Sequence, residues 1–412
     1  MRNSICASLI GIAAAGCGGD AATTRPTALA AQPGDGPAFN IETFASLGGT
    51  ASRGNAISNQ GWVAGWSLLE DGSRHATLWR SGTPDDLGTL GGAASMVQWP
   101  GINNTGMVAG ISETAEEDSL GEAWSCEAFL GESDRVCRGF VHADDIMSAM
   151  PTLGGTHSFA TGVNNRGQVV GWAETAVHDP TCRESQVLQF RAVLWEPRNG
   201  ALQQLPPLPG DSTSAATAIN QRGQVVGISG ECDIAVGRFS ARHAVLWDQG
   251  EVTEIGNLGG TTWHTPMDIN EHGDVVGFSN PAGPGDPEGE FIAQAFLWSP
   301  QGGTTPLGTL EGDLFSQAHA VNDSGVVVGV SFGGASGSRA FLWADGAIHD
   351  FNDLVGGFPG VFQSAQDIND RGQVTGRVML NETGEVVTFV ATPVEQQQFS
   401  TVEAARQKRP TP

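Results

Sequence analysis

The sequence is poor in basic side chains. Of its 412 residues, 20 are Lys or Arg and 45 are Asp or Glu, the formal net charge is −25, and Lys408 is the only lysine. Such a surface repels the phosphates of nucleic acids and the headgroups of anionic lipids. We therefore expect neither a nucleic acid nor a membrane surface as a partner.

A membrane-spanning apolar run is also missing. The apolar stretch Ile5–Ala15, which follows Arg2, is shorter than the ~20 residues of a spanning helix, and the small residues of "AAGC" end at Cys17. This pattern resembles the lipobox of bacterial lipoproteins, and Gly18 resembles the signal for outer-membrane placement. We predict a signal peptide over 1–17, lipidation of Cys17, and export to the periplasm or cell surface as an outer membrane lipoprotein. An ordinary secreted protein and a wrongly assigned start are the alternatives.

Motifs of several enzyme classes are absent. The sequence has no G-x-S-x-G, no H-E-x-x-H, no phosphate-binding glycine loop and no dinucleotide fingerprint between a strand and a helix. We therefore predict no catalytic residues and no cofactor. Calcium binding by the acidic stretch "GPGDPEGE" at 283–290 is conceivable, but its ligand spacing matches no recognised loop.

Large apolar residues are scarce at both ends of the chain. Residues 18–39 are mostly Ala, Thr, Pro and Gly, and residues 393–412 are mostly polar. Neither segment can bury enough apolar surface to fold. We predict a flexible tether over 18–39, one folded domain over 40–392, and a polar tail over 393–412.

The folded part contains a nine-residue motif seven times: an aliphatic residue, usually Asn, two variable residues, Gly, an apolar pair and Gly. The copies are Ile57–Gly65, Ile102–Gly110, Val163–Gly171, Ile219–Gly227, Ile269–Gly277, Val321–Gly329 and Ile368–Gly376, and Ser58 replaces Asn in the first. Asn can bond its own backbone two residues on, and Gly accepts the positive φ of a hairpin turn with a bulge. These asparagines are interpreted as turn residues, not catalytic ones.

Two further landmarks recur with the same rhythm. One is an apolar strand ending in Trp, as in "HAVLW" at 243–247 and "RAFLW" at 339–343; the other is "LGTLGG" or a variant, first seen in "NIETFASLGG" at 40–49. Each unit thus has four candidate strands, with "LGTL" as the fourth. Units of this length with four strands are typical of propeller blades.

The order of the pieces predicts how the ring closes. The chain begins with a lone fourth strand at 40–49, and the last unit, from Ser364 to about Thr392, lacks one. We predict an all-β, seven-bladed β-propeller with four-stranded blades, in which the N-terminal strand completes the last blade and removes an exposed edge. The strand-end tryptophans are expected between blades and not on a ligand: Trp79, Trp195, Trp247, Trp298 and Trp343.

The three motifs together resemble the HAF-repeat family of bacterial extracellular repeat proteins. The likeness covers about residues 40–392, although no copy contains His-Ala-Phe in full: His75 and His243 keep the His, while Phe296 and Phe341 keep the Phe. The resemblance implies export and repetition, and it supplies no catalytic residues.

Four cysteines remain after the signal peptide, all in long insertions between the second and third strands of a unit: Cys126, Cys137, Cys182 and Cys232. Four cysteines allow three pairings. We favour Cys126–Cys137 and Cys182–Cys232, which suits an oxidising compartment. A zinc site with all four cysteines as ligands is the alternative, although it lacks the usual close Cys-x-x-Cys spacing.

The insertions Ser112–Arg138, Ala173–Phe190, Ser229–Arg242 and Ser279–Ala293 are expected on one face of the propeller. Loops on that face also supply the candidate ligand-binding residues: Trp99, His157, Trp263, His264, Phe315 and His319. For each of them, an ordinary packing role is the alternative. Asp268 and Asp367 are expected either to face the axis or, as we favour, to bond a neighbouring blade.

These observations favour a monomeric, non-enzymatic binding or adhesion module for a glycan or a surface protein. The alternative is a propeller enzyme, a lyase or glycoside hydrolase that acts on polysaccharide with histidines or paired carboxylates. A purely structural role is a third possibility, since a propeller fold by itself specifies no activity.

Overall fold

The computed structural model describes residues 38–283 and 291–394, and nearly all of its regular structure is antiparallel β-sheet. Five sheets have four strands each, paired in sequence order, with these bounds: β6 (Gly91–Met96), β7 (Val108–Glu117), β8 (Arg135–Ala143), β9 (Ile146–Ala149); β10 (Gly154–Val163), β11 (Val169–His178), β12 (Leu188–Glu196), β13 (Ala201–Leu205); β14 (Thr213–Ile219), β15 (Val225–Gly230), β16 (His243–Asp248), β17 (Glu251–Glu254); β18 (Thr265–Ile269), β19 (Val275–Ser279), β20 (Gln294–Ser299), β21 (Gly303–Gly308); β22 (Phe315–Val321), β23 (Val327–Phe332), β24 (Arg339–Ala344), β25 (Ala347–Asp350). The prediction of an all-β protein with four-stranded sheets is confirmed.

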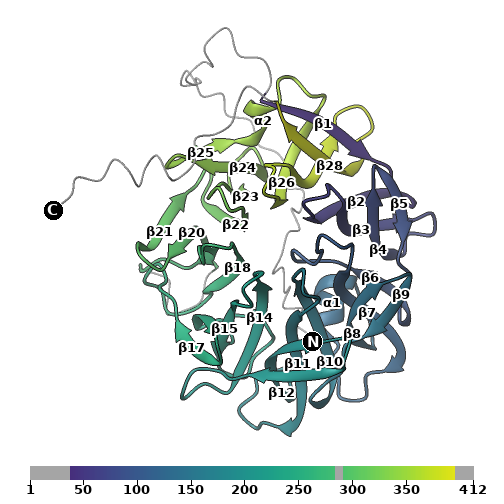
Figure 1. The fold of residues 1–412 in the computed structure, drawn as a ribbon, viewed down its shortest axis with the longest axis vertical. Helices are drawn as coiled ribbons and strands as arrows, with labels where there is room; N and C mark the ends of the chain where they lie inside the picture. Colours follow the sequence, from purple (N-terminus) through teal and green to yellow (C-terminus); the bar gives the residue numbers. More distant parts are fainter. Residues whose placement is uncertain (1–37, 284–290, 395–412) are drawn as a thin grey trace, which may run out of the picture.

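A further sheet has eight strands, taken from both ends of the chain. Its members are β26 (Gly360–Ile368), β27 (Val374–Leu380), β28 (Val386–Pro393), β2 (Gly48–Ile57), β3 (Val63–Leu69), β4 (Arg74–Arg80), β5 (Thr83–Asp86) and, beside β28, β1 (Phe39–Phe44). Two short helices, α1 (Trp124–Leu130) and α2 (Phe351–Leu354), lie outside the sheets. Figure 1 shows the sheets standing around a central axis, with β14, β18, β22 and β26 close to it.

The central strands are apolar on both faces because other sheets cover both sides of them. Every residue of β15 is buried, for example, and Val225 and Val226 belong to two different apolar clusters. The strand-end tryptophans occupy such contacts, as predicted. Trp195 packs with Met107 and Val141 of the preceding sheet.

The repeated Asn forms the turn that was predicted for it. Asn220 Oδ1 accepts hydrogen bonds from the backbone N of Arg222 at 3.1 Å and of Gln224 at 3.0 Å. Gly223 has φ +85°, a conformation that glycine adopts without strain. The final Gly of the motif is also required, since a Cβ on Gly227 would lie 2.1 Å from the backbone O of Ala215.

The first strand of most sheets contains a β-bulge just before this turn. The register shifts between Ala216 and Ala218 and between Ala365 and Asp367, for example. A bulge redirects the side chain of the extra residue. At two of these bulges the redirected side chain reaches the next repeat. Asn55 donates to the backbone O of Val97, and Thr161 donates to the backbone O of Ala216.

The fourth strand of each sheet differs from its prediction. The four-residue strands β5, β9, β17 and β25 precede the "LGTLGG" motif, which mostly forms the connection back to the axis. These outer strands face solvent, and β5 and β17 are mostly polar; in β17, Glu251, Thr253 and Glu254 are exposed. They therefore lack the apolar pattern on which the assignment depended.

The ends of the fold lie close to their predicted positions. β1 begins at Phe39, one residue earlier than predicted, and Phe39 is buried against Phe351 with ring centres 5.1 Å apart. Residues 48 and 49, predicted to end this strand, instead begin β2. β1 pairs antiparallel with β28 over six residues, from Phe39 opposite Pro393 to Phe44 opposite Thr388. Residues 1–37 and 395–412, with most of the predicted signal peptide, tether and tail, lie outside the described residues.

Candidate functional site

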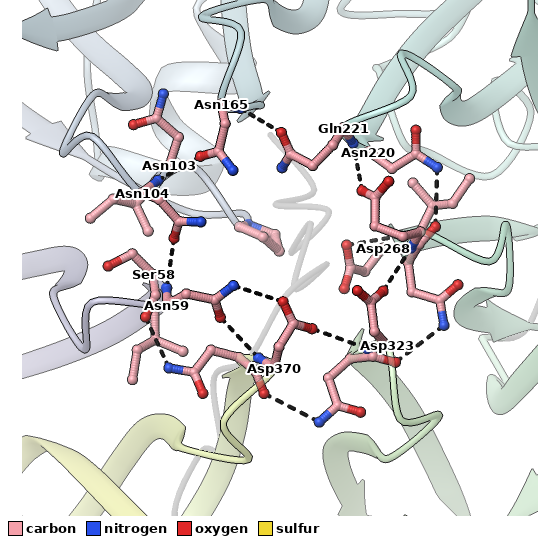
Figure 2. Close-up of a pocket in the computed structure, with 18 of the residues that line it drawn as sticks. Ser58, Asn59, Asn103, Asn104, Asn165, Asn220, Gln221, Asp268, Asp323 and Asp370 are labelled. Carbon is pink, nitrogen blue, oxygen red and sulfur yellow. Dashed lines mark hydrogen bonds between the residues drawn. The ribbon is translucent and has the colours of Figure 1, made fainter. Parts of the chain in front are cut away.

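The Asn turns surround a cavity of about 170 Å³ at one end of the central axis (Figure 2). Its wall combines the aliphatic residue of the motif with the Asn and the polar residue that follows it. The lining residues include Ile57, Ile102, Val163, Ile219, Ile269, Val321 and Ile368, with Asn59, Asn104, Asn165, Gln221, Glu271, Asp323 and Asp370.

One chain of hydrogen bonds links the turns around the cavity. The Nδ2 of each turn Asn donates to the backbone O of the corresponding residue in the next turn around the cavity, at 2.9–3.2 Å. The donors are Asn103, Asn164, Asn220, Asn270, Asn322 and Asn369, the last of which donates to Ser58 O. Ser58 has no Nδ2, so the chain is interrupted between Ser58 and Asn103.

A second set of hydrogen bonds forms a closed ring at the rim. The backbone N of each residue after the turn Asn donates to the side-chain oxygen of its counterpart in the next sheet, at 2.6–3.1 Å. The order is Asn59, Asn104, Asn165, Gln221, Glu271, Asp323, Asp370 and back to Asn59. Each rim side chain is thereby held in place by the backbone of its neighbour.

The rim is divided into two halves by charge. Asn59, Asn104, Asn165 and Gln221 are neutral amides, whereas Glu271, Asp323 and Asp370 carry carboxyl groups. The ring occupies one oxygen of each side chain, and Asn59 Nδ2 also donates to Asp370 Oδ2 at 2.7 Å, so a second nitrogen or oxygen remains on the other five side chains. Amides on one half and carboxylates on the other can bind hydroxyl groups as donors and acceptors.

A further carboxyl lies in the cavity wall. Asp268 Oδ2 accepts from Val321 N of the next sheet at 3.0 Å, and its Oδ1 accepts from Ile269 N at 2.8 Å. Burial, together with the charges of the nearby Asp370 and Asp323, raises the pKa of Asp268 to about 6. Its counterpart Asp367 bonds Ile57 N at 2.7 Å, and burial followed by the charge of Asp268 raises its pKa well above the usual range. The expected bond to a neighbouring sheet is confirmed for Asp268, and Asp367 makes the corresponding bond from β26 to β2 within the eight-stranded sheet.

The structure places the six candidate ligand-binding residues away from this cavity. Trp99 is 1% exposed and packs on Phe159 and Trp172, with ring centres 5.2 and 5.9 Å away. Trp263 is also buried and contacts Phe291. Phe315 is partly buried against Phe332 of its own sheet.

The three histidines of that set are buried and hydrogen-bonded. His157 Nδ1 accepts from Cys137 N at 3.1 Å, and His264 contacts Ser279 Oγ at 2.7 Å and Gly260 O at 3.0 Å. His319 Nδ1 bonds Ala365 O at 2.8 Å, and burial lowers the pKa of His319 to about 4. None of the six lines the cavity. Their contact with a ligand stays a prediction.

The four insertions pack together, which explains this burial. One apolar cluster joins Cys126 and Phe129, Phe190, Val236 and Ala293, one or two from each insertion, to Trp99. The expectation that all four lie on one face is confirmed. Disulfides Cys126–Cys137 and Cys182–Cys232 tie the insertions as predicted, and disulfides are consistent with an exported protein. Residues 284–290, most of the acidic stretch considered for calcium, lie outside the described residues.

The rim is what the sequence interpretation missed. The signal was present, because the residue after each turn Asn, or after Ser58, is always Asn, Gln, Asp or Glu. A turn position open to solvent tolerates many residue types. A side-chain oxygen at this position in all seven repeats therefore indicates a hydrogen bond that every repeat makes.

Within the described residues, no helix is long and apolar enough to cross a membrane.

Comparison with known proteins finds a limited structural likeness. No family model and no curated protein matches the sequence. An acylaminoacyl peptidase structure is similar with 11% identity and a TM-score of 0.48, over 88% of this chain and 54% of the other, so this chain spans about half of that protein. An oligogalacturonate lyase from Vibrio parahaemolyticus has 11% identity and a TM-score of 0.46, over 89% and 100%. A gluconolactonase from Xanthomonas campestris has 11% identity and a TM-score of 0.33, over 63% and 82%.

At such identities and TM-scores the likeness assigns no activity to this chain.

Proposed function

We propose that the chain is a seven-bladed β-propeller that binds a neutral glycan, or a glycan on a surface protein, at the cavity of the Asn turns. In this proposal it is exported and held by a lipid on Cys17, and it is a member of the HAF-repeat family. The closed polar rim around the cavity is the observation on which the binding proposal rests.

The blade count rests on how the eight-stranded sheet divides. A single parallel residue pair, Ala51 with Val386, joins β2 to β28, whereas six antiparallel pairs join β1 to β28. We therefore divide the sheet into β26-β27-β28-β1 and β2-β3-β4-β5. With the five four-stranded sheets this makes seven blades, closed by the N-terminal strand. The closed ring of rim hydrogen bonds supports the same count.

The cavity suits a small polyhydroxylated group. Its wall has an aliphatic layer and a few convergent polar groups, the combination that small-molecule sites use for affinity and orientation. The carboxylate half of the rim and the net charge of −25 disfavour an acidic ligand there.

Asp268 supports a second candidate, an enzyme that acts on polysaccharide. A carboxyl with a pKa near 6 holds its proton at mildly acidic pH while ordinary carboxylates are ionised, and such a difference is typical of acid and base pairs in glycoside hydrolysis. The Asp268 oxygens both accept backbone hydrogen bonds, which favours a structural role and leaves the binding module as our first choice.

A glycan array followed by calorimetry tests the proposal on the full-length chain. Asp323→Asn keeps a side-chain oxygen for the ring and removes the charge, so the fold should persist. Glycan binding should weaken about tenfold, equivalent to roughly 1.4 kcal/mol. Asp85→Asn, on the exposed outer strand β5, is the matched control and should bind normally.

Two results would contradict the binding module. One is equal glycan binding by the wild type, Asp323→Asn and Asp85→Asn. The other is cleavage of a glycan that the array identifies, with turnover lost in Asp268→Asn while binding is retained; that result would establish the enzyme instead.

A further inference from the structure

Arg53 and Arg74 lie together on the insertion side of the molecule, away from the cavity. Arg53 on β2 is 7% exposed, and its Nη2 donates to Gln366 Oε1 at 2.6 Å. Arg53 pairs with Trp66 across β2 and β3. The guanidinium of Arg74, at the start of β4, lies 4.6 Å from the centre of the Trp66 ring and donates to the backbone O of Phe129 in the first insertion.

Arg377 joins this pair from the neighbouring β27. It lies opposite Ser364 of β26, two residues before the Gln366 that binds Arg53. The charges of Arg377 and Arg74 both act on the Arg53 guanidinium, so three guanidinium groups from β2, β4 and β27 lie near one another. We call them the arginine cluster: Arg53, Arg74 and Arg377.

Several donors in the arginine cluster are unused. Among the described residues, no hydrogen-bond partner exists for the buried Nε of Arg53, Arg74 or Arg377, or for the buried Oγ of Ser364. A buried polar group without a partner costs free energy. Four such groups at one place are therefore a site at which an acceptor is missing.

No carboxylate neutralises the arginine cluster within residues 38–283 and 291–394. None of the ion pairs there includes Arg53, Arg74 or Arg377. By contrast, the shielded Arg339 binds Asp313 at 2.9 Å and Asp350 at 2.8 Å. In a chain with 45 acidic side chains, three arginines without an ion pair in the described part of the chain are unusual.

The three charges also repel one another. Burial lowers the pKa of the Arg53 guanidinium, and the charges of Arg377 and Arg74 lower it further. Such an arrangement is unfavourable for folding unless an anion occupies it. Guanidinium groups bind oxyanions through paired, charge-assisted hydrogen bonds.

We propose that Arg53, Arg74 and Arg377, with Ser364, form a binding site for an oxyanion: the carboxylate, sulfate or phosphate group of a small acid or an acidic sugar. This site is separate from the neutral-glycan cavity and does not depend on it. Arg74 and Arg377 are only partly buried, so solvent reaches the cluster through them.

Calorimetry of the full-length chain with sodium sulfate, sodium phosphate and sodium glucuronate, each at the same ionic strength, tests the proposal. At least one should bind the wild type, while glucose should not bind this site. Arg377→Gln and Arg74→Gln should each weaken the binding at least about tenfold. Arg371→Gln, an exposed arginine of the β26–β27 turn, is the matched control and should bind like the wild type.

Thermal unfolding separates this role from a structural one. Without anion, Arg377→Gln should have the same Tm as the wild type or a higher one, because it removes a repulsion. The anion should raise the Tm of the wild type and not that of the variant. If Arg377→Gln does not fold, Arg74→Gln provides the same comparison.

The salt that binds identifies the chemical class of the natural ligand. Binding of glucuronate supports a carboxylate ligand, and binding of sulfate and phosphate alone supports a sulfated or phosphorylated one. The proposal is overturned if none of the three binds, or if the cluster variants and Arg371→Gln bind them equally.

Discussion

At the residue scale, the turn asparagine holds its own turn and the next sheet at once. Asn164 Oδ1 accepts two backbone N–H groups of its own turn, while its Nδ2 donates to Asn220 O. Asp would lack the donor, and Ser would lack a group long enough to reach. The amide is therefore the side chain that serves both purposes.

Ser58→Asn is expected to stabilise the protein, because the introduced amide can donate to Asn103 O and complete the interrupted chain. A hydrogen bond of this kind contributes about 0.5–1.5 kcal/mol. Chemical denaturation should show that gain in the free energy of unfolding. The reciprocal Asn103→Ser should lose about 1–3 kcal/mol, since it leaves buried groups of the turn and of Asn164 unsatisfied. A Ser58→Asn protein no more stable than the wild type would contradict the role of the chain.

The turn role of these residues could be predicted, but the link between sheets could not. Asn-x-x-Gly specifies a local turn, so Asn220 and Gly223 are predictable from four residues. The acceptor, Asn270 O, is 50 residues away and lies within reach only once the sheets stand side by side. For Asp268 and Asp367, a position at the end of a buried strand was sufficient to predict a bond to a neighbour.

At the element scale, the outer strands were the least predictable part of the fold. They are short and largely exposed, and in β5, β17 and β25 an acidic residue pairs with a basic residue near the start of the third strand. His75 binds Asp86 at 2.8 Å, His243 binds Glu254 at 2.9 Å, and Arg339 binds Asp350 at 2.8 Å. The variable first residue of the His-Ala-Phe motif thus pairs across strands, a contact that an apolar pattern cannot indicate.

The disulfides should differ in their contributions because they close loops of different length. Cys182–Cys232 closes 50 residues and joins two sheets, whereas Cys126–Cys137 closes 11 residues within one insertion. Replacing both cysteines of a pair with serine should lower the free energy of unfolding by roughly 4 and roughly 3 kcal/mol, respectively.

Urea denaturation under non-reducing conditions measures both losses, and a reducing agent should lower the wild type toward the variants. Equal or reversed losses would show that strain or residual structure, and not loop length, determines the contribution of each pair.

At the scale of the whole molecule, the repeated units allowed the arrangement of sheets to be predicted but not the location of the site. Trp99, His157 and His264 were assigned to the correct face, yet the insertions fold over that face and bury them. Whether an insertion covers or exposes a loop depends on its tertiary packing, which no repeat pattern describes. The cavity lies instead at the turn end, where the repeat itself supplies the lining.

The cavity and the arginine cluster also differ in charge. Glu271, Asp323 and Asp370 line the cavity, whereas none of the three arginines does, and Arg74 contacts the first insertion. We therefore expect neutral and acidic ligands to bind at separate sites without competing.

The central claim is that the first strand completes the last sheet, and a disulfide crosslink tests it most directly. Asn40 and Thr392 are exposed and directly opposite each other in the β1–β28 pairing. In a chain with Cys6 and Cys17 replaced by serine, the double variant Asn40→Cys, Thr392→Cys should form a crosslink on oxidation, detected by mass spectrometry. Asn40→Cys with Asn381→Cys, in the exposed turn at the far end of β27, is the control and should not. Failure of the first pair to crosslink, or equal crosslinking of both pairs, would contradict the closed ring.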